Sequence, residues 1–192
     1  MIASARKDDQ RRELIRRRLG LDKGLRERAD AAIASVACEL VRQSRSRIVA
    51  AFVAHRGEPD VTSVLEWLDS SERIALLPVV RDLDMHFRRW RPGAQMVANR
   101  FGIPEPASSR EHTPADIDLV LMPLVGFAAD GARLGMGAGF YDRAFAFRRG
   151  QPEAAPRLVG VAYSVQEIES LATDDWDVPL DGVITEDGLR WF

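Results

Sequence analysis

The stretch Ile117-Asp-Leu-Val-Leu-Met-Pro-Leu-Val125 is almost entirely apolar and is followed at once by a glycine-rich segment. A short apolar run of this kind, bounded by turn residues, is typical of a strand buried on both faces of a sheet. The glycines that follow predict a loop, and the residues from there through Arg149 a short helix. Strand, loop and helix in this order indicate an α/β fold.

The rest of the chain extends the same alternation. Further strands are expected at residues 47–53, 73–80 and 157–163, with a half-exposed strand at 85–90 and a last short strand at 183–185. Helices are expected at 5–19, from an Asp22 N-cap through Leu40, and around Val61 to Leu68. Residues 91–116 are rich in proline and glycine and are expected to be mostly loop. Alternating strands and helices predict an α/β layered sheet with helices on both faces.

Length and composition limit the class of protein. The chain has 192 residues, a formal net charge of -2 and one cysteine. We therefore expect a single domain over residues 1–192, without a disulfide or a four-cysteine zinc site, in a reducing compartment. There is no apolar run of about 20 residues, and the acids Asp8, Asp9 and Glu13 argue against a transit peptide. We expect a cytoplasmic protein that is a monomer and does not bind membranes.

The segment Arg133-Leu-Gly-Met-Gly-Ala-Gly-Phe-Tyr-Asp-Arg143 carries the chemistry. Glycines at alternate positions let the backbone come close to a ligand, so that successive N–H groups converge on phosphate oxygens. The N-terminus of the following helix would add partial positive charge. Arg133 and Arg143 add permanent charges, and Asp142 is an oxygen ligand suited to the Mg²⁺ that accompanies ATP.

Other interpretations of these glycines were weighed. They could make only a tight connection between strand and helix. A dinucleotide fingerprint requires its third glycine three positions on and a later acid, and neither is present. The Gly-Lys-Ser/Thr of a standard P-loop is also missing.

A second cationic element lies near the N-terminus. Lys7 and Arg11 are four residues apart and share a face of the expected helix, where they could grip a polyphosphate. The alternatives are a solvated basic face and a nucleic-acid-binding arm, since seven Lys or Arg residues lie between Arg6 and Arg18. The chain is not basic overall and has no recognisable nucleic-acid motif. The residues alone leave this choice open.

Taken together, these segments resemble the 5-formyltetrahydrofolate cyclo-ligase family. The glycine loop is similar to that family's R-L-G-x-G-x-G-Y-Y-D-R, and Lys7 to Leu14 to its K-x-x-x-R-x-E-L. Further resemblances, in family order, are Gly57-Glu58 before Val61-Thr62, Phe101-Gly-Ile-Pro-Glu-Pro106, Trp176-Asp-Val-Pro-Leu-Asp181 and Val183-Ile-Thr-Glu186. They cover nearly the whole chain.

The resemblance implies a three-layer α/β/α sandwich with a mostly parallel sheet, and an ATP-dependent enzyme that closes 5-formyltetrahydrofolate to 5,10-methenyltetrahydrofolate. Its partners would be ATP and a reduced folate, with Mg²⁺ as cofactor and no nucleic acid. The resemblance places catalysis on Arg133, Tyr141 and Lys7, the metal on Asp142 and Asp177, and the folate on Glu58, Met85 and Phe101. The ATP-binding residues would be Lys7, Arg11, Arg133, Leu134, Gly135, Met136, Gly137, Ala138, Gly139, Phe140 and Tyr141.

Three departures from the family pattern keep a second reading open. Ala128 stands where the family usually has aspartate, with the acid instead at Asp130. Ala138 often is a lysine, and Phe140 replaces the first tyrosine. A non-catalytic relative that binds ATP or folate is therefore the alternative. For Met85 and Phe101 the alternative is ordinary core packing.

The expected chemistry needs no protein nucleophile. The phosphoryl group of ATP would pass to the formyl oxygen, and a ring-side amine would then displace phosphate. The chain has no evident nucleophile and base pair, and His55, His86 and His112 are not at ligand spacing. Catalysis would rest on positioning and on stabilisation of charge.

Overall fold

The computed structural model describes residues 2–151 and 154–192, and the side chains from Lys7 onward. Its helices are α1 Ile2–Leu19, α2 Lys23–Ser44, α3 Thr62–Ser70 and α4 Phe140–Ala144. The longer strands are β1 Ile48–Ala50, β2 Ile74–Arg81, β3 Asp84–Arg89, β7 Leu119–Pro123, β10 Arg157–Val161, β11 Gly182–Thr185 and β12 Gly188–Trp191. The remaining short strands are β4 Met96–Ala98, β5 Pro104–Pro106, β6 Glu111–His112, β8 Gly126–Phe127 and β9 Arg133–Leu134.

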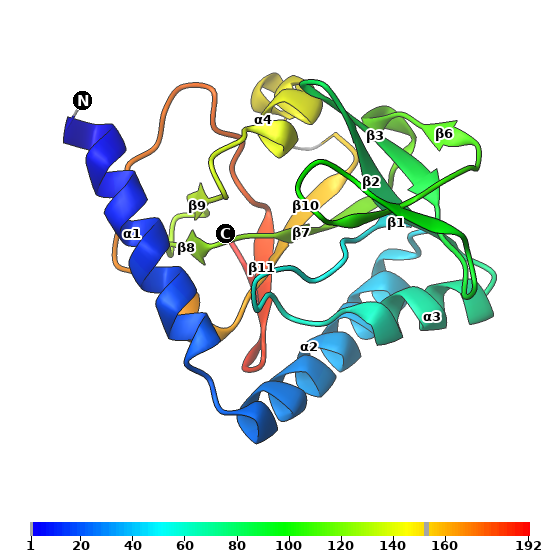
Figure 1. Cartoon of the computed structure of the whole chain (residues 1–192), viewed down its shortest axis with the longest axis horizontal. Coiled ribbons are helices and arrows are strands. Elements are labelled where there is room, and N and C mark those ends of the chain that lie inside the picture. Colours follow the sequence, from blue (N-terminus) through cyan, green and yellow to red (C-terminus); the bar gives the residue numbers. More distant parts are fainter. Residues whose placement is uncertain (1, 152–153) are drawn as a thin grey trace.

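One sheet of eight strands runs through the molecule in the order β12-β11-β10-β7-β1-β2-β3-β6 (Figure 1). The five inner strands β11, β10, β7, β1 and β2 are parallel to one another. The outer strands β12, β3 and β6 pair antiparallel at the two edges. The prediction of a mostly parallel sheet is confirmed.

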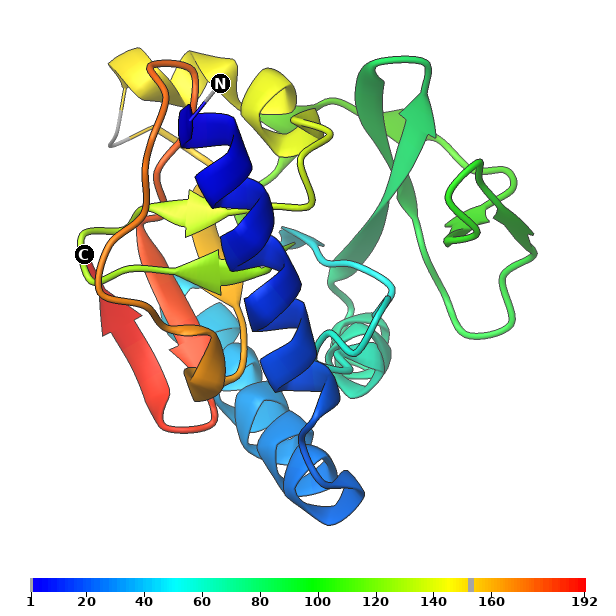
Figure 2. The ribbon, with the colours of Figure 1, turned by 60° about the vertical axis from the view of Figure 1, so that its left-hand side comes forward.

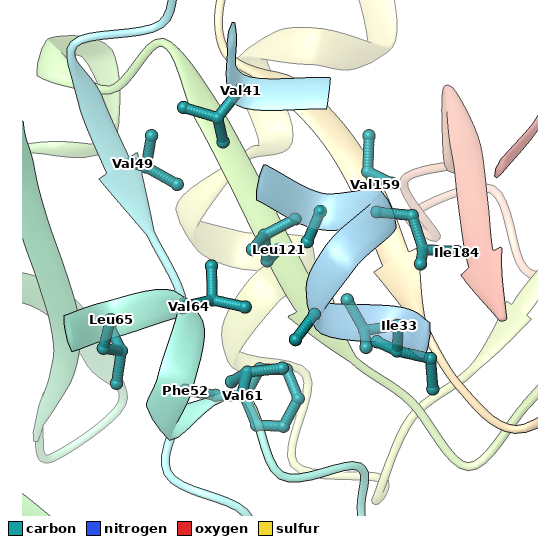
Figure 3. Packing of buried hydrophobic residues seen from close by; sticks show 14 of the residues in the cluster. Ile33, Val41, Val49, Phe52, Val61, Val64, Leu65, Leu121, Val159 and Ile184 are labelled. Carbon is teal, nitrogen blue, oxygen red and sulfur yellow. The ribbon is translucent and has the colours of Figure 1, made fainter. Parts of the chain in front are cut away.

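Helices α2 and α3 cover one face of this sheet (Figure 1). Alternate strand residues such as Val49, Leu121 and Val159 point into this layer and meet Ile33 and Val41 of α2 (Figure 3). All five side chains are fully buried. The period of two along the strands and of three to four along α2 therefore builds this half of the core.

The opposite face is covered more thinly. Val120, Met122 and Leu158 point to this side and pack with Phe127 and Phe145. The helical cover consists of α4 and the 3₁₀ helix Ala146–Gly150, which follow the glycine loop. The three-layer sandwich with helices on both faces is confirmed, although this second layer is made of short pieces and loops.

Helix α1 lies apart from both layers, against the hairpin formed by β8 and β9 (Figure 2). Its Leu14 is 1% exposed and packs with Val125 and Leu134. Gly126 in β8 makes this approach possible, because a Cβ there would lie 2.4 Å from Leu14 Cδ1. The sequence predicts α1, but not the hairpin on which it packs.

The order of the strands creates a crevice. The chain passes from β1 to β2 on one side, then returns across the sheet to β7 on the other side of β1. Neighbouring parallel strands whose connections leave in opposite directions open a gap at their carboxyl ends, where α/β proteins bind ligands. No helix in the described part of the chain is long and apolar enough to cross a membrane.

Most expected elements are found, with corrections at the edges. Asp22 caps α2, its Oδ1 accepting hydrogen bonds from the backbone N–H groups of Gly24 and Leu25. Strand β12 was not predicted, and the expected loop 91–116 contains the short strands β4, β5 and β6. Such two- and three-residue strands lack a hydrophobic period long enough to recognise in sequence.

Candidate functional site

A cleft of about 1680 Å³ opens at the carboxyl ends of β1 and β7, at the crossing point of the sheet. Phe52 and Val53 after β1 line it on one side, and Pro123 and Leu124 at the end of β7 on the other. Its volume exceeds the roughly 300–1,000 Å³ of a typical single-ligand pocket, so it has room for two substrates.

Every candidate residue from the sequence lines this one cleft. These are Lys7, Arg11, Glu58, Met85, Phe101, Arg133, Leu134, Gly135, Met136, Gly137, Ala138, Gly139, Phe140, Tyr141, Asp142 and Asp177. They come from α1, from the loop after β1, from β3, β9 and α4, and from three later loops.

The glycine loop has the backbone that its sequence predicts. Gly137 has φ of 95° and Gly139 of 67°, conformations that disfavour any residue with a Cβ. Gly137 also borders Arg11, whose Cζ would lie 3.4 Å from a Cβ at that position. The helix that follows has only five residues, so its dipole adds less positive charge than we expected.

Two cations of α1 face this loop and the segment before β11. Arg11 Nε donates to the carbonyl oxygen of Gly135 at 2.9 Å. Lys7 Nζ donates to Asp174 Oδ2 at 2.7 Å and to Asp177 Oδ2 at 3.2 Å. Partial burial lowers the pKa of Lys7, but the hydrogen bonds to both aspartates outweigh it and leave the pKa raised. Lys7 is therefore charged at neutral pH.

Arg133 joins three segments at the base of the loop. Its side chain is 5% exposed. Nε donates to the carbonyl oxygen of Val178 at 3.1 Å, and Nη2 donates to Asp142 Oδ1 at 2.6 Å. The third nitrogen, Nη1, lies 3.7 Å from the position of a Cβ on Gly135 and so faces the glycine loop. This nitrogen is placed to reach an anion bound there.

The acidic residues fit a metal ion that arrives with a nucleotide. Asp142 Oδ1 and Asp177 Oδ2 accept the hydrogen bonds of this region, whereas none found among the described residues uses Asp142 Oδ2 or Asp177 Oδ1. Among all the residues that the structure describes, no group of three or more His, Cys, Asp or Glu side chains is arranged to hold a metal ion. Mg²⁺ bound through phosphates needs only one or two carboxylates, so the donor set suits Mg-ATP.

Glu58 lines the same cleft from the loop after β1. Its Oε2 accepts a hydrogen bond from the backbone N–H of His55 at 3.0 Å. Its Oε1 lies 3.7 Å from Nη2 of Arg18. Burial raises the pKa of Glu58 to about 7, against the opposing effects of the Arg18 charge and the His55 hydrogen bond. Because this pKa lies close to neutral pH, small changes in the surroundings of Glu58 can change its protonation state.

Aromatic side chains line the cleft beside Glu58. Burial raises the pKa of Tyr141, and the charge of Glu58 adds to this, so the hydroxyl stays protonated. Phe101 is 46% exposed, which excludes the alternative of core packing, and its ring meets Phe140 edge to face at 5.9 Å. Met85 both lines the cleft and is 6% exposed within the core.

Sequence reasoning missed several residues of the site. Asp174, Trp176 and Arg100 all line the cleft, and Trp176 is 60% exposed there. Arg18 is fully buried beneath it, although the sequence shows it only as one cation in a basic run. Trp176 stands directly before Asp177, and this neighbour in the sequence could have been recognised as part of the site. Nothing in the sequence indicates that Arg18 is buried.

The comparisons with known proteins agree with this geometry. The sequence model of the 5-formyltetrahydrofolate cyclo-ligase family matches residues 3–186. The 5-formyltetrahydrofolate cyclo-ligase of Haemophilus influenzae is 31% identical over 179 residues, which are 91% of this chain and 94% of that protein.

Two solved structures share the fold. The NMR structure of Aquifex aeolicus 5,10-methenyltetrahydrofolate synthetase superposes with a TM-score of 0.80 at 32% identity, covering 96% of this chain and 92% of that one. The 5,10-methenyltetrahydrofolate synthetase of Mycoplasma pneumoniae gives a TM-score of 0.76 at 26% identity, covering 94% and 98%.

Proposed function

The chain belongs to the 5-formyltetrahydrofolate cyclo-ligase family, and we propose that its cleft converts 5-formyltetrahydrofolate to 5,10-methenyltetrahydrofolate with consumption of ATP. The observation that carries the proposal is that the phosphate-binding and folate-binding candidates line one cleft. The placement of individual residues below, the monomeric state and the cytoplasmic location remain predictions.

The triphosphate of ATP is assigned to the glycine loop. Arg11 braces the loop through the Gly135 carbonyl, and Arg133 presents Nη1 beside Gly135. Lys7 approaches from the α1 side, held by Asp174 and Asp177. Donors on two sides of a narrow loop can bind polyphosphate oxygens and hold the terminal phosphoryl group for transfer.

The reduced folate is assigned to the part of the cleft that Glu58 lines. The ionised carboxylate of Glu58 can accept hydrogen bonds from the amino and ring N–H groups of a pterin. Met85 and Phe101 offer apolar surface beside it. Two arginines stack on the ring of Phe140, which packs on Phe101. The guanidinium carbon of Arg100 lies 5.8 Å from the centre of the Phe140 ring, and that of Arg143 lies 5.1 Å from it. Neither arginine has an ion pair within the described residues, so both can face the glutamate carboxylates of the folate.

The proposed reaction proceeds in two steps. The formyl oxygen attacks the terminal phosphorus, and the bond from that phosphorus to ADP breaks. The N10 amine then attacks the activated carbon, the carbon–oxygen bond breaks, and phosphate leaves while the N10 proton passes to solvent. Asp142 and Asp177 would hold Mg²⁺, which supplies neutralisation of phosphate charge.

The protein's part in this chemistry is positioning. Lys7 and Arg133 balance charge on the transferring phosphoryl group. Protonated Tyr141 can donate a hydrogen bond within the same cleft. Ala138 offers no cation where many relatives have lysine, so Lys7 and Arg133 carry more of this task.

A spectroscopic assay tests the proposal directly. The methenyl product absorbs in the near ultraviolet and the formyl substrate does not, so purified protein with Mg-ATP and 5-formyltetrahydrofolate should give a growing absorbance. Release of ADP should match the product one for one, and omission of ATP should abolish both. Protein that binds both substrates yet forms no product would instead support the non-catalytic alternative.

A further inference from the structure

Arg18 is a charged side chain at the carboxyl end of α1 with no contact to water. It is 0% exposed, which is rare for arginine because removing its charge from water is costly. The proposed phosphate site does not use it, since that site is formed by Lys7 and Arg11 in the earlier turns of the same helix. Its burial therefore calls for a separate explanation.

The Arg18 guanidinium spans the crevice of the sheet. Nε donates to the carbonyl oxygen of Arg56 at 2.9 Å, in the loop after β1. Nη1 donates to the carbonyl oxygen of Leu124 at 3.1 Å, directly after β7. These two bonds fix the plane of the guanidinium between the two strand ends that border the cleft.

The third nitrogen is directed at Glu58. Nη2 is buried and has no hydrogen-bond partner among the described residues. The nearest carboxylate oxygen is Glu58 Oε1 at 3.7 Å. A buried donor without a hydrogen bond is unfavourable, so this nitrogen is stabilised chiefly by the Glu58 charge.

We propose that Arg18 is a positioning residue that holds Glu58 ionised and turned toward the cleft, where it recognises the pterin. This inference rests on the proposed function. Arg18 itself touches no substrate. Because α1 also carries Lys7 and Arg11, one helix would set both substrate sites.

The surroundings of Glu58 predict how pH enters. The charged or titratable groups that face it are Arg18 from α1 and Tyr141 from α4, with His55 and Arg56 on its own loop. Around Arg18 lie Glu58, Tyr163, Arg26 and Arg56. Of the two groups nearest Glu58, Tyr141 stays neutral, so Arg18 supplies the positive charge that opposes protonation of Glu58.

The pH dependence follows from the pKa of about 7 for Glu58. A protonated Glu58 loses an acceptor for the pterin, so folate KM should rise as pH falls through about 7 while the KM for ATP changes little. Neutralising Arg18 removes the charge that favours ionised Glu58. The pH at which folate KM begins to rise (the pH limb for folate) should therefore move to a higher value.

The experiment compares Arg18→Met and Arg18→Gln with wild type, measuring KM for each substrate across this pH range and folate Kd by calorimetry without ATP. Both variants should bind folate about fivefold more weakly at pH 7, because raising the pKa of Glu58 by about one unit from about 7 lowers its ionised fraction from about one half to about one tenth. They should recover affinity as pH rises, and Arg18→Lys should keep most of the wild-type affinity. Arg18→Gln keeps a donor toward the Leu124 carbonyl, so it serves if the methionine variant does not fold.

Arg17→Met is the matched control, since Arg17 is exposed on the same helix and its one ion pair among the described residues is with Glu13. Glu58→Gln should abolish the pH limb, and adding Arg18→Gln to it should change folate affinity little further. The inference would be overturned if Arg18→Gln had the same folate affinity as Arg17→Met and the same pH dependence of folate KM. A loss of affinity for both substrates without a pH shift would also overturn it, because it indicates a purely structural role. If the wild type binds no reduced folate at any pH, the proposed function itself fails.

Discussion

At the scale of single residues, Arg133 has two kinds of contact that a substitution will affect differently. Two of its nitrogens hold Asp142 and the Val178 carbonyl, and the third faces the glycine loop. The first pair fixes the geometry of the loop, while the third nitrogen is the one available to phosphate. The sequence motif predicts a functional role for this arginine but does not reveal this division between its nitrogens.

Arg133→Ala should lower kcat by about 10²–10³, the usual effect of removing one preorganised donor from a developing charge. Steady-state rates of methenyl formation measure this. Circular dichroism and thermal melting should show a folded protein, because Arg11 still donates to the Gly135 carbonyl and Asp142 still accepts a hydrogen bond from the backbone N–H of Val178. Turnover close to wild type would remove Arg133 from the proposed mechanism.

Gly137→Ala should weaken ATP binding. Its φ of 95° strains any residue with a Cβ, at a cost of roughly 1–3 kcal/mol, and the new methyl group would contact Arg11, which braces the loop. We expect a higher KM for ATP with an unchanged KM for folate. Gly150→Ala is the control, since among the described residues no atom beyond its chain neighbours lies within 4 Å of the added Cβ. Equal KM values for ATP in the two variants would contradict this account of the loop.

At the scale of elements, α1 is the helix whose location decides the site. Its basic sequence predicts a helix, and its Lys7 and Arg11 share a face as expected. Its packing partner could not be predicted, because β8 and β9 have only two residues each. The close approach of Gly126 to Leu14 is visible only in the structure. The choice between a nucleic-acid arm and a polyphosphate clamp was open in the sequence, and the contacts with Gly135 and Asp174 favour the clamp.

Leu14→Ala should loosen this helix. The side chain is fully buried against the hairpin, so its truncation should lower the free energy of unfolding by about 2–5 kcal/mol. Urea denaturation measures the loss. Leu25→Ala in α2 is the comparison, because Leu25 is 51% exposed and should change stability little. Similar losses in both variants would show that α1 is not anchored through Leu14.

At the scale of the whole molecule, the cleft is formed by segments far apart in sequence. The loop motif could be located from its glycines, and the alternation of strands and helices was sufficient to predict an α/β layered sheet with helices on both faces. Contacts such as that of Lys7 with Asp174, which are 167 residues apart, have no local signal. The same holds for Arg18 and Glu58, whose meeting depends on strand order and not on spacing.

Mg-ATP should stabilise the entire fold, since in the proposed complex it would bridge α1, the glycine loop and the segment before β11. Ligand at 100 times its Kd adds about 2.7 kcal/mol, and each kcal/mol raises Tm by about 2–4 °C in a chain of this size. Differential scanning calorimetry should therefore show a rise of roughly 5–10 °C with Mg-ATP. Arg11→Ala should reduce this rise, and a Tm that ignores Mg-ATP would argue against the nucleotide site.

The pairing of Lys7 with Asp174 and Asp177 has a consequence for biosynthesis. The ribosome adds Lys7 to the chain 170 residues before Asp177, so a nascent chain holds the α1 cations before it holds the acids that orient them. A newly made chain would thus be unable to consume ATP until folding has brought α1 and the segment with Asp174 and Asp177 together.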